Sequence, residues 1–90
     1  MDAVEATLEI KNRLGLHLRA ASALAETVRR FKSVVKIAIG ENEVDARSVI
    51  NLMMLGASMG TRLKLRIEGP DAQAALEAVR KLFENRFGED

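Results

Sequence analysis

Four short segments of this chain alternate apolar with charged or polar side chains at a period of two, and this pattern constrains the fold more than any other feature. The segments are 4–10, 35–39, 43–47 and 62–68. Such alternation predicts strands of a sheet that buries one face and leaves the other in water. The second and third segments are joined by Gly40-Glu41-Asn42, whose residue types favour a hairpin turn.

Between these segments the apolar residues recur every three or four positions, which predicts helices over 18–31, 49–55 and 72–83. Ser48 is a favourable N-cap for the second helix, and Gly56 is a favourable residue just after its end. The predicted order is therefore β-α-β-β-α-β-α. This order predicts an α+β fold in which a four-stranded antiparallel sheet carries its three helices on one face.

The face of the sheet that the helices leave bare is expected to carry charges. Glu5 and Glu9 are predicted to lie across from Arg62, Lys64 or Arg66. Exposed pairs of this kind contribute only ~0–1 kcal/mol each, so we assign them no function.

The composition excludes several classes of protein. The 90 residues include no Cys, which excludes disulfides, zinc sites of the Cys type and iron–sulfur clusters. A formal charge of +1 and an aromatic content of three Phe argue against a nucleic-acid partner. No apolar run approaches the ~20 residues that cross a bilayer, and the N-terminus has no signal-peptide pattern. We therefore expect a single domain over residues 1–90, cytoplasmic and not inserted in a membrane.

The only histidine, His17, stands where the first loop meets the first predicted helix. The unpaired N–H groups and the positive dipole end of a helix start favour an anion such as a phosphoryl group and disfavour an imidazolium. A neutral ring nitrogen at this place can act as a nucleophile, and Arg19 can donate charge-assisted hydrogen bonds to phosphoryl oxygens. The competing interpretation is a merely structural histidine, the commoner role of a lone His.

Other chemistries find less support in the sequence. The serines have no acid–base partner apart from His17 and no orienting acid, which argues against a hydrolase. One His without Cys cannot build a zinc site, and Glu41, Glu43 and Asp45 diverge along a strand instead of converging on calcium. The glycines lack the spacing of a phosphate-binding loop. We therefore expect no metal and no cofactor.

Segment 49–55, followed by Met59, is more apolar than a two-turn helix can bury, since Asn51 is its only polar residue. Two interpretations have equal weight. The segment is either a tightly packed core helix or a partly exposed, Met-containing docking surface that adapts to several partners.

Around these residues the chain resembles the HPr family, the histidine-containing phosphocarriers of the bacterial phosphoenolpyruvate-dependent phosphotransferase system. Gly15-Leu16-His17-Leu18-Arg19-Ala20-Ala21 is similar to the family's Gly-x-His-Ala-Arg-Pro-Ala signature. Ala46-Arg47-Ser48-Val49-Ile50, followed by Leu55-Gly56-Ala57-Ser58-Met59-Gly60-Thr61, is similar to its second block. The resemblance covers the whole chain and implies the family's open-faced β-sandwich, in agreement with the order predicted from periodicity.

The resemblance implies a phosphocarrier and not a self-sufficient enzyme. It implies that enzyme I phosphorylates His17 on a ring nitrogen, that the group passes to a IIA protein or domain, and that Arg19 pairs with the phosphoryl group. Ser48 matches a serine that HPr kinase/phosphorylase modifies in some bacteria, which would add negative charge beside the docking surface. A plain N-cap role is the competing interpretation of Ser48.

The partner-binding surface that the resemblance implies comprises Arg47, Val49, Ile50 and Met53, with Leu24 of the first helix as a neighbour. We expect a monomer that binds enzyme I and a IIA protein through this surface.

The chain departs from the family pattern at Ala20, which replaces the signature proline and loosens the helix start. Asn12-Arg13-Leu14-Gly15 and the ending 82–90 are closer to the nitrogen-branch carriers called NPr, and the choice between sugar and nitrogen branch stays open. Two rival functions also remain. One is an HPr-like regulatory module that binds a partner without relaying phosphate, and the other is a small ligand-binding α/β domain.

Overall fold

A computed structural model describes residues 3–89, and within them four strands form one antiparallel sheet in the order β1-β4-β2-β3. The strands are β1 (Ala3–Glu9), β2 (Val34–Ile39), β3 (Asn42–Asp45) and β4 (Arg62–Glu68). The last strand in the sequence pairs with both β1 and β2 and so lies inside the sheet. The antiparallel sheet predicted from the alternation is confirmed.

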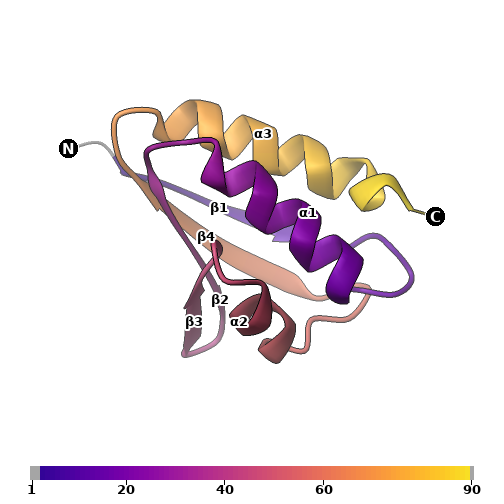
Figure 1. Cartoon of the computed structure of the whole chain (residues 1–90). Helices are drawn as coiled ribbons and strands as arrows, with labels where there is room; N and C mark the ends of the chain where they lie inside the picture. Colours follow the sequence, from indigo (N-terminus) through magenta and orange to yellow (C-terminus); the bar gives the residue numbers. More distant parts are fainter. Residues whose placement is uncertain (1–2, 90) are drawn as a thin grey trace.

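The helices cover one face of this sheet (Figure 1). α1 (Leu18–Arg29) and α3 (Ala72–Glu84) lie side by side, and the short α2 (Val49–Met54) packs next to α1 and β3. The predicted order β-α-β-β-α-β-α is confirmed. The sequence did not predict the 3-10 turn η1 (Arg86–Gly88), because three residues have no hydrophobic period.

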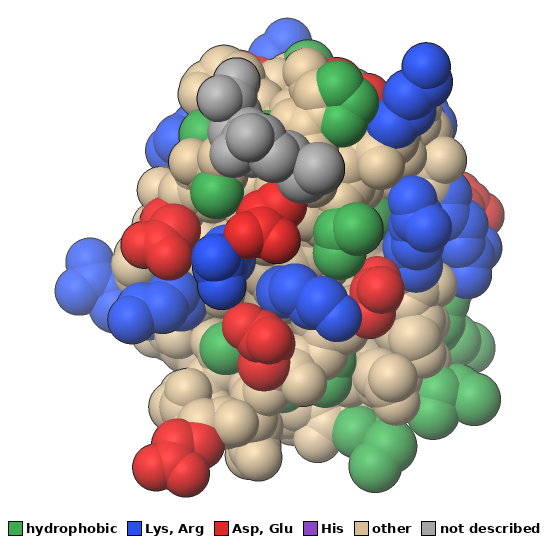
Figure 2. Space-filling view, turned by 90° about the vertical axis from the view of Figure 1, so that its left-hand side faces the viewer, with side chains coloured by type: hydrophobic (Ala, Val, Ile, Leu, Met, Phe, Trp, Pro, Cys, Tyr) green, Lys and Arg blue, Asp and Glu red, His purple; other side chains and the backbone are tan. Residues whose placement is uncertain are grey.

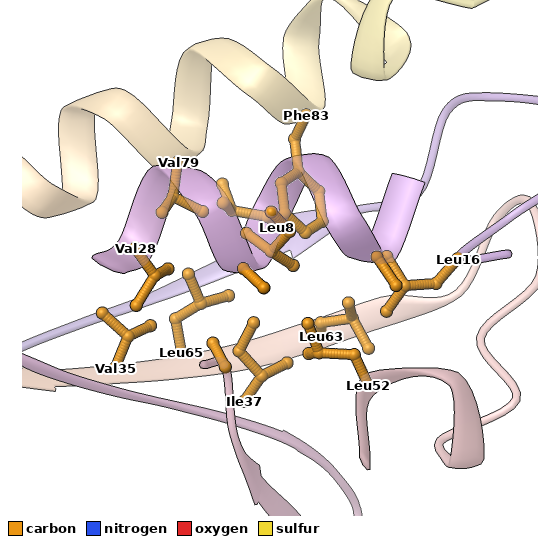
Figure 3. Close-up of a cluster of buried hydrophobic side chains, with 14 of the residues drawn as sticks. Leu8, Leu16, Val28, Val35, Ile37, Leu52, Leu63, Leu65, Val79 and Phe83 are labelled. Atoms are coloured by element: carbon orange, nitrogen blue, oxygen red, sulfur yellow. The ribbon is translucent and has the colours of Figure 1, made fainter. Parts of the chain in front are cut away.

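The core lies between the helices and the sheet (Figure 3). Leu63 and Leu65 of β4 lie in it on the side of the sheet, and Val28 of α1 and Phe83 of α3 lie in it on the side of the helices. Leu52 is the residue of α2 that is buried in this core. Full burial of a large apolar side chain contributes about 1.5–3 kcal/mol, so this cluster stabilises a chain that has no disulfide.

The opposite face of the sheet is charged. Along β4, exposed charged residues alternate with the buried leucines. The register places Glu9 opposite Arg62 and Glu5 opposite Arg66, as predicted. Figure 2 shows acidic and basic side chains intermixed on one side of the molecule and not gathered by sign. Such intermixing creates no strong field of one sign on that side.

Asp71 ties the loop before β2 to the start of α3. Its carboxylate accepts hydrogen bonds from the Ser33 hydroxyl and from the backbone N–H groups of Lys32 and Ser33. These bonds hold the pKa of Asp71 below its usual value of 3.8, with the Ser33 hydroxyl as the largest cause. Asp71 stands at the N-cap position of α3, but its side chain makes no hydrogen bond to that helix.

Candidate functional site

His17 is the N-cap residue of α1, the position predicted for it. Its backbone is extended, with φ −80° and ψ −176°, and its carbonyl accepts the first intrahelical hydrogen bond from the Ala21 N–H at 2.8 Å. Within the described part of the chain, the ring makes no hydrogen bond that caps the helix. The half-buried imidazole therefore stands at the helix start without being used to close it.

The loop that carries His17 is fixed to the segment that precedes β4. The Leu16 N–H donates a hydrogen bond to the Ala57 carbonyl at 2.9 Å. Gly15 has a φ of +69°, and a side chain at this position would clash with the same carbonyl. Both the conformation and the space therefore require glycine here, and the loop delivers His17 in a defined position.

The first turn of α1 offers unpaired backbone N–H groups. Because intrahelical bonding begins at Ala21, the N–H groups of Leu18, Arg19 and Ala20 have no hydrogen-bond acceptor among residues 3–89. The exposed Arg19 side chain lines a surface hollow together with Arg13, Leu14, Gly88 and Glu89. Free donors, the positive end of a helix and a guanidinium together suit an anion with several oxygens.

Two residues from distant parts of the chain meet at the His17 ring. Oε2 of Glu89 lies 2.6 Å from Nε2 of His17, and Oε1 of Glu89 accepts a hydrogen bond from Nδ2 of Asn12 at 2.9 Å. Asn12 is fully buried, and its Nδ2 also donates to the Gly15 carbonyl at 2.8 Å. The Gly15 carbonyl and the Glu89 carboxylate can only accept hydrogen bonds, so the NH₂ group of the Asn12 amide must face them. Asn12 therefore holds Glu89 against His17.

The carboxyl group of Glu89 is ionised at neutral pH. Desolvation is the largest single influence on it and raises the pKa of Glu89. The hydrogen bonds from Asn12 and His17, with the electrostatic influence of His17 and of the Arg19 guanidinium, outweigh desolvation and lower this pKa below its usual value of 4.5. The site thus contains a carboxylate in contact with the imidazole.

Ser48 is the N-cap residue of α2, as predicted. Its Oγ accepts a hydrogen bond from the Asn51 N–H at 3.2 Å, and its carbonyl accepts one from the Leu52 N–H at 3.0 Å. The neighbouring Arg47 side chain is exposed, while the Arg47 carbonyl accepts a hydrogen bond from Arg29 of α1 at 2.7 Å. The start of α2 is therefore closed by its own serine and tied to α1.

The apolar side chains of α2 are mostly exposed. Leu52 is the one buried residue of the six in this helix, Ile50 is 71% exposed, and Val49 is half-buried against the core. These exposures decide between the two interpretations of segment 49–55 in favour of an accessible surface. We give the name apolar face to the exposed apolar side chains of α2, of the loop after it, of the loop before α1 and of the first residue of α1: Leu14, Leu18, Ile50, Met53, Met54 and Met59.

The prediction that Leu24 neighbours this surface is wrong. Leu24 is 0% exposed and belongs to the core beneath α1. It lies on the stripe of α1 that repeats every three to four residues toward the sheet. The residue of α1 that reaches the apolar face is Leu18, at the start of the helix.

Sequence reasoning did not identify Asn12 and Glu89 as members of the site. Glu89 lies in a short charged ending without hydrophobic period, 72 positions from His17. No local pattern signals a contact over that separation. The structural signal is the complete burial of Asn12, because a buried amide in a loop must find partners.

Among residues 3–89, no helix is long and apolar enough to span a bilayer. The same residues contain no group of three or more His, Cys, Asp or Glu arranged to hold a metal ion.

Comparison with known proteins gives consistent matches. Residues 4–85 match a family model described as PTS HPr component phosphorylation site. The chain is 42% identical to phosphocarrier protein HPr of Xylella fastidiosa over 87 residues, which cover 97% of this chain and 98% of that relative. It is 40% identical to phosphocarrier protein NPr of Escherichia coli over 88 residues, with the same two coverages. The crystal structure of HPr from Thermoanaerobacter tengcongensis matches with a TM-score of 0.92 at 39% identity, covering 97% of this chain and 98% of that one.

Proposed function

The chain belongs to the HPr family of phosphocarriers of the phosphotransferase system, and from this premise we propose that His17 carries the phosphoryl group. In this proposal His17 accepts the group from enzyme I and passes it to a IIA protein or domain. The observation that carries the proposal is the imidazole at the start of α1, beside the free N–H groups of the first turn. The protein is a carrier, and the remaining catalytic machinery belongs to its cytoplasmic partners.

In the proposed transfer, a ring nitrogen of His17 is the nucleophile. Its lone pair forms the new N–P bond while the bond between phosphorus and the donor atom breaks, and that electron pair stays with the donor. The N–H groups of the first turn and the Arg19 guanidinium stabilise charge on the phosphoryl oxygens. The site lies at the surface, so it stabilises the phosphohistidine only moderately and leaves it a good donor.

We place partner docking on the surface formed by Arg47, Val49, Ile50 and Met53 and extend it to the rest of the apolar face. Methionine side chains are flexible and adapt to different shapes, which suits a surface that must fit enzyme I and then a IIA protein. The nearby Arg13, Arg19 and Arg47 favour partners with an acidic rim. Encounter rates with such partners should fall as salt rises.

Ser48 enters the proposal as a second phosphorylation site, for an HPr kinase/phosphorylase. A phosphate there adds a charge of about −1.5 to −2 beside the docking surface and hinders partners with an acidic rim. The Oγ of Ser48 already accepts the Asn51 N–H, so the modification would replace this cap. Incubation with the kinase and ATP tests the point: an acid-stable adduct, absent from Ser48→Ala, supports it, and no adduct leaves Ser48 as an N-cap.

The experiment that tests the carrier function is the intact mass of the chain after incubation with phosphoenolpyruvate and enzyme I. Homologues of enzyme I from the sugar branch and from the nitrogen branch are used in separate reactions. We expect one acid-labile phosphoryl adduct with one of the two enzymes, and the enzyme that produces it identifies the branch. No adduct on the folded chain with either enzyme would contradict the carrier function and favour a regulatory module that does not relay phosphate.

A further inference from the structure

The end of the chain places an acidic side chain directly on the His17 ring. Oε2 of Glu89 lies 2.6 Å from Nε2 of His17, and the Glu89 side chain is only 11% exposed. The last turn of the chain and the start of α1 lie at the same end of the molecule (Figure 1). The proposed transfer makes no use of this contact.

The turn that delivers Glu89 is held in a conformation that its residues disfavour. Arg86 and Phe87 both have a φ of 55°, a left-handed conformation that residues with a Cβ atom disfavour. Phe87 is buried, and its ring centroid lies 5.0 Å from that of Phe83 in α3. Packing therefore offsets the backbone cost, and strain of this kind gathers at functional sites.

Asn12 fixes the same carboxylate from inside the molecule. Its fully buried amide donates to Oε1 of Glu89 and to the Gly15 carbonyl, in the loop that leads to His17. One buried side chain thus connects the loop before α1 with the end of the chain. The arrangement holds Oε2 of Glu89 at the ring, because Oε1 is already engaged.

We propose that Glu89 is a positioning residue for phosphoryl transfer at His17, an inference that rests on the proposed carrier function. A carboxylate can only accept a hydrogen bond, so Nε2 carries a proton, and in the neutral ring Nδ1 therefore carries the lone pair. Glu89 thereby selects the tautomer and orients the ring, as the outer partner of a functional histidine does in other sites.

Transfer then proceeds through Nδ1. The Nδ1 lone pair forms the bond to phosphorus as the bond to the donor atom breaks, and the electron pair of the broken bond stays with the donor. The Nε2 proton remains on the ring, and the Glu89 carboxylate stabilises the positive charge that develops on the imidazole. Transfer to the next acceptor reverses these changes at Nδ1.

The test compares Glu89→Gln, which keeps the size of the side chain and removes its charge, with a matched control. Glu84→Gln removes the same charge from an exposed residue at the end of α3. The rate of phosphorylation by enzyme I is measured against the concentration of each chain. We expect Glu89→Gln to lower the maximal rate about tenfold or more, as loss of an outer partner of histidine does elsewhere. KM should stay within about twofold because the Glu89 side chain is only 11% exposed and is already held by Asn12 and His17.

A second readout addresses the ring proton itself. We expect wild type to show a downfield Nε2–H resonance of His17 in ¹H NMR, protected from exchange by Glu89, and Glu89→Ala to lose it. A maximal rate in Glu89→Gln equal to that of Glu84→Gln, or a melting temperature that falls while the maximal rate holds, would overturn the positioning role alone. A folded wild-type chain that takes no phosphoryl group would overturn the carrier function and this role together.

Discussion

The starts of α1 and α2 have the same backbone design and differ in what the N-cap side chain does. At both, an extended N-cap residue accepts the first intrahelical hydrogen bond through its carbonyl, at 2.8 Å from Ala21 to His17 and at 3.0 Å from Leu52 to Ser48. Ser48 also accepts the Asn51 N–H through its side chain, whereas the equivalent N–H of Ala20 has no acceptor among residues 3–89.

This difference separates a helix start used for stability from one used for binding. A capped N–H contributes to the stability of the fold but is no longer free for a ligand. An N–H left free contributes no capping energy and remains a donor for an anion. In α1 the N-cap side chain, His17, contacts Glu89 and does not cap the helix. The N–H groups of the first turn therefore remain available as donors at the place where the proposed phosphoryl group binds.

The largest expected effect comes from replacing His17. His17→Ala and His17→Ser should both lose all acid-labile phosphorylation, as measured by intact mass after incubation with enzyme I. They should differ in stability, because serine can cap α1 as Ser48 caps α2. We expect His17→Ser to exceed His17→Ala by about 1 kcal/mol in the free energy of unfolding, measured in urea. An acid-labile phosphoryl group on either folded variant would contradict the assignment of His17.

Replacing Arg19 tests whether its guanidinium binds the phosphoryl oxygens together with the backbone N–H groups of the first turn of α1. Arg19→Ala removes charge-assisted hydrogen bonds worth roughly 1.5–3 kcal/mol and should slow phosphorylation about tenfold or more. The control is Arg62→Ala, which removes an equal charge from the exposed face of β4. Both variants should keep the wild-type melting temperature, since exposed arginines contribute little packing. A loss of rate in Arg19→Ala that merely follows a loss of stability would argue against a role in transfer.

Replacing Ser48 tests how much its side-chain cap contributes to the stability of α2. Ser48→Ala leaves the Asn51 N–H without its acceptor and should lower the free energy of unfolding by about 1 kcal/mol. Ser48→Thr keeps a hydroxyl and should stay close to wild type in the same urea titration. Phosphorylation of His17 should proceed in both variants when they are folded. Equal stability of Ser48→Ala and wild type would show that the hydroxyl does not contribute as a cap.

Local periodicity was enough to predict the four strands and the three α-helices of this fold, but not the 3-10 turn η1. The alternation along 62–68 identified β4 and its buried residues, and the change of period at Leu18 marked the first residue of α1. The apolar pattern of segment 49–55 predicted where α2 lies but not which of its side chains are exposed. Nearly all residues of this short helix are apolar, whereas only Leu52 is buried, so the pattern does not distinguish buried from exposed positions. Exposure depends on what the sheet leaves uncovered, which periodicity does not encode.

The sequence predicted only those site residues that lie close to one another along the chain. His17, Arg19 and the free N–H groups lie within one turn, so the sequence placed them together. Leu24 was misassigned because its helical position was judged from a resemblance and not from the stripe that faces the core. Asn12 and Glu89 could not be connected, since their contact depends on the path of α3 and on the turn that follows it.

The smallest change in stability is expected from replacing Ala20 with proline. Among residues 3–89, the N–H of Ala20 is the group that is uncapped at the start of α1, whereas its counterpart at the start of α2, the N–H of Asn51, is capped by Ser48. Ala20→Pro removes this free donor without breaking a hydrogen bond of the described chain, and it fixes φ in the first turn, where proline is tolerated. We expect the free energy of unfolding to rise by about 0.4–1 kcal/mol, because the unfolded chain loses conformational freedom. The control is Ala23→Pro, which removes an intrahelical hydrogen bond within α1 and should cost about 3 kcal/mol or more. Ala20 is fully buried, so a loss of stability in Ala20→Pro would mean that the proline ring does not fit the packing there or that the N–H of Ala20 contributes to the fold. Either result would contradict the expectation that the start of α1 tolerates proline.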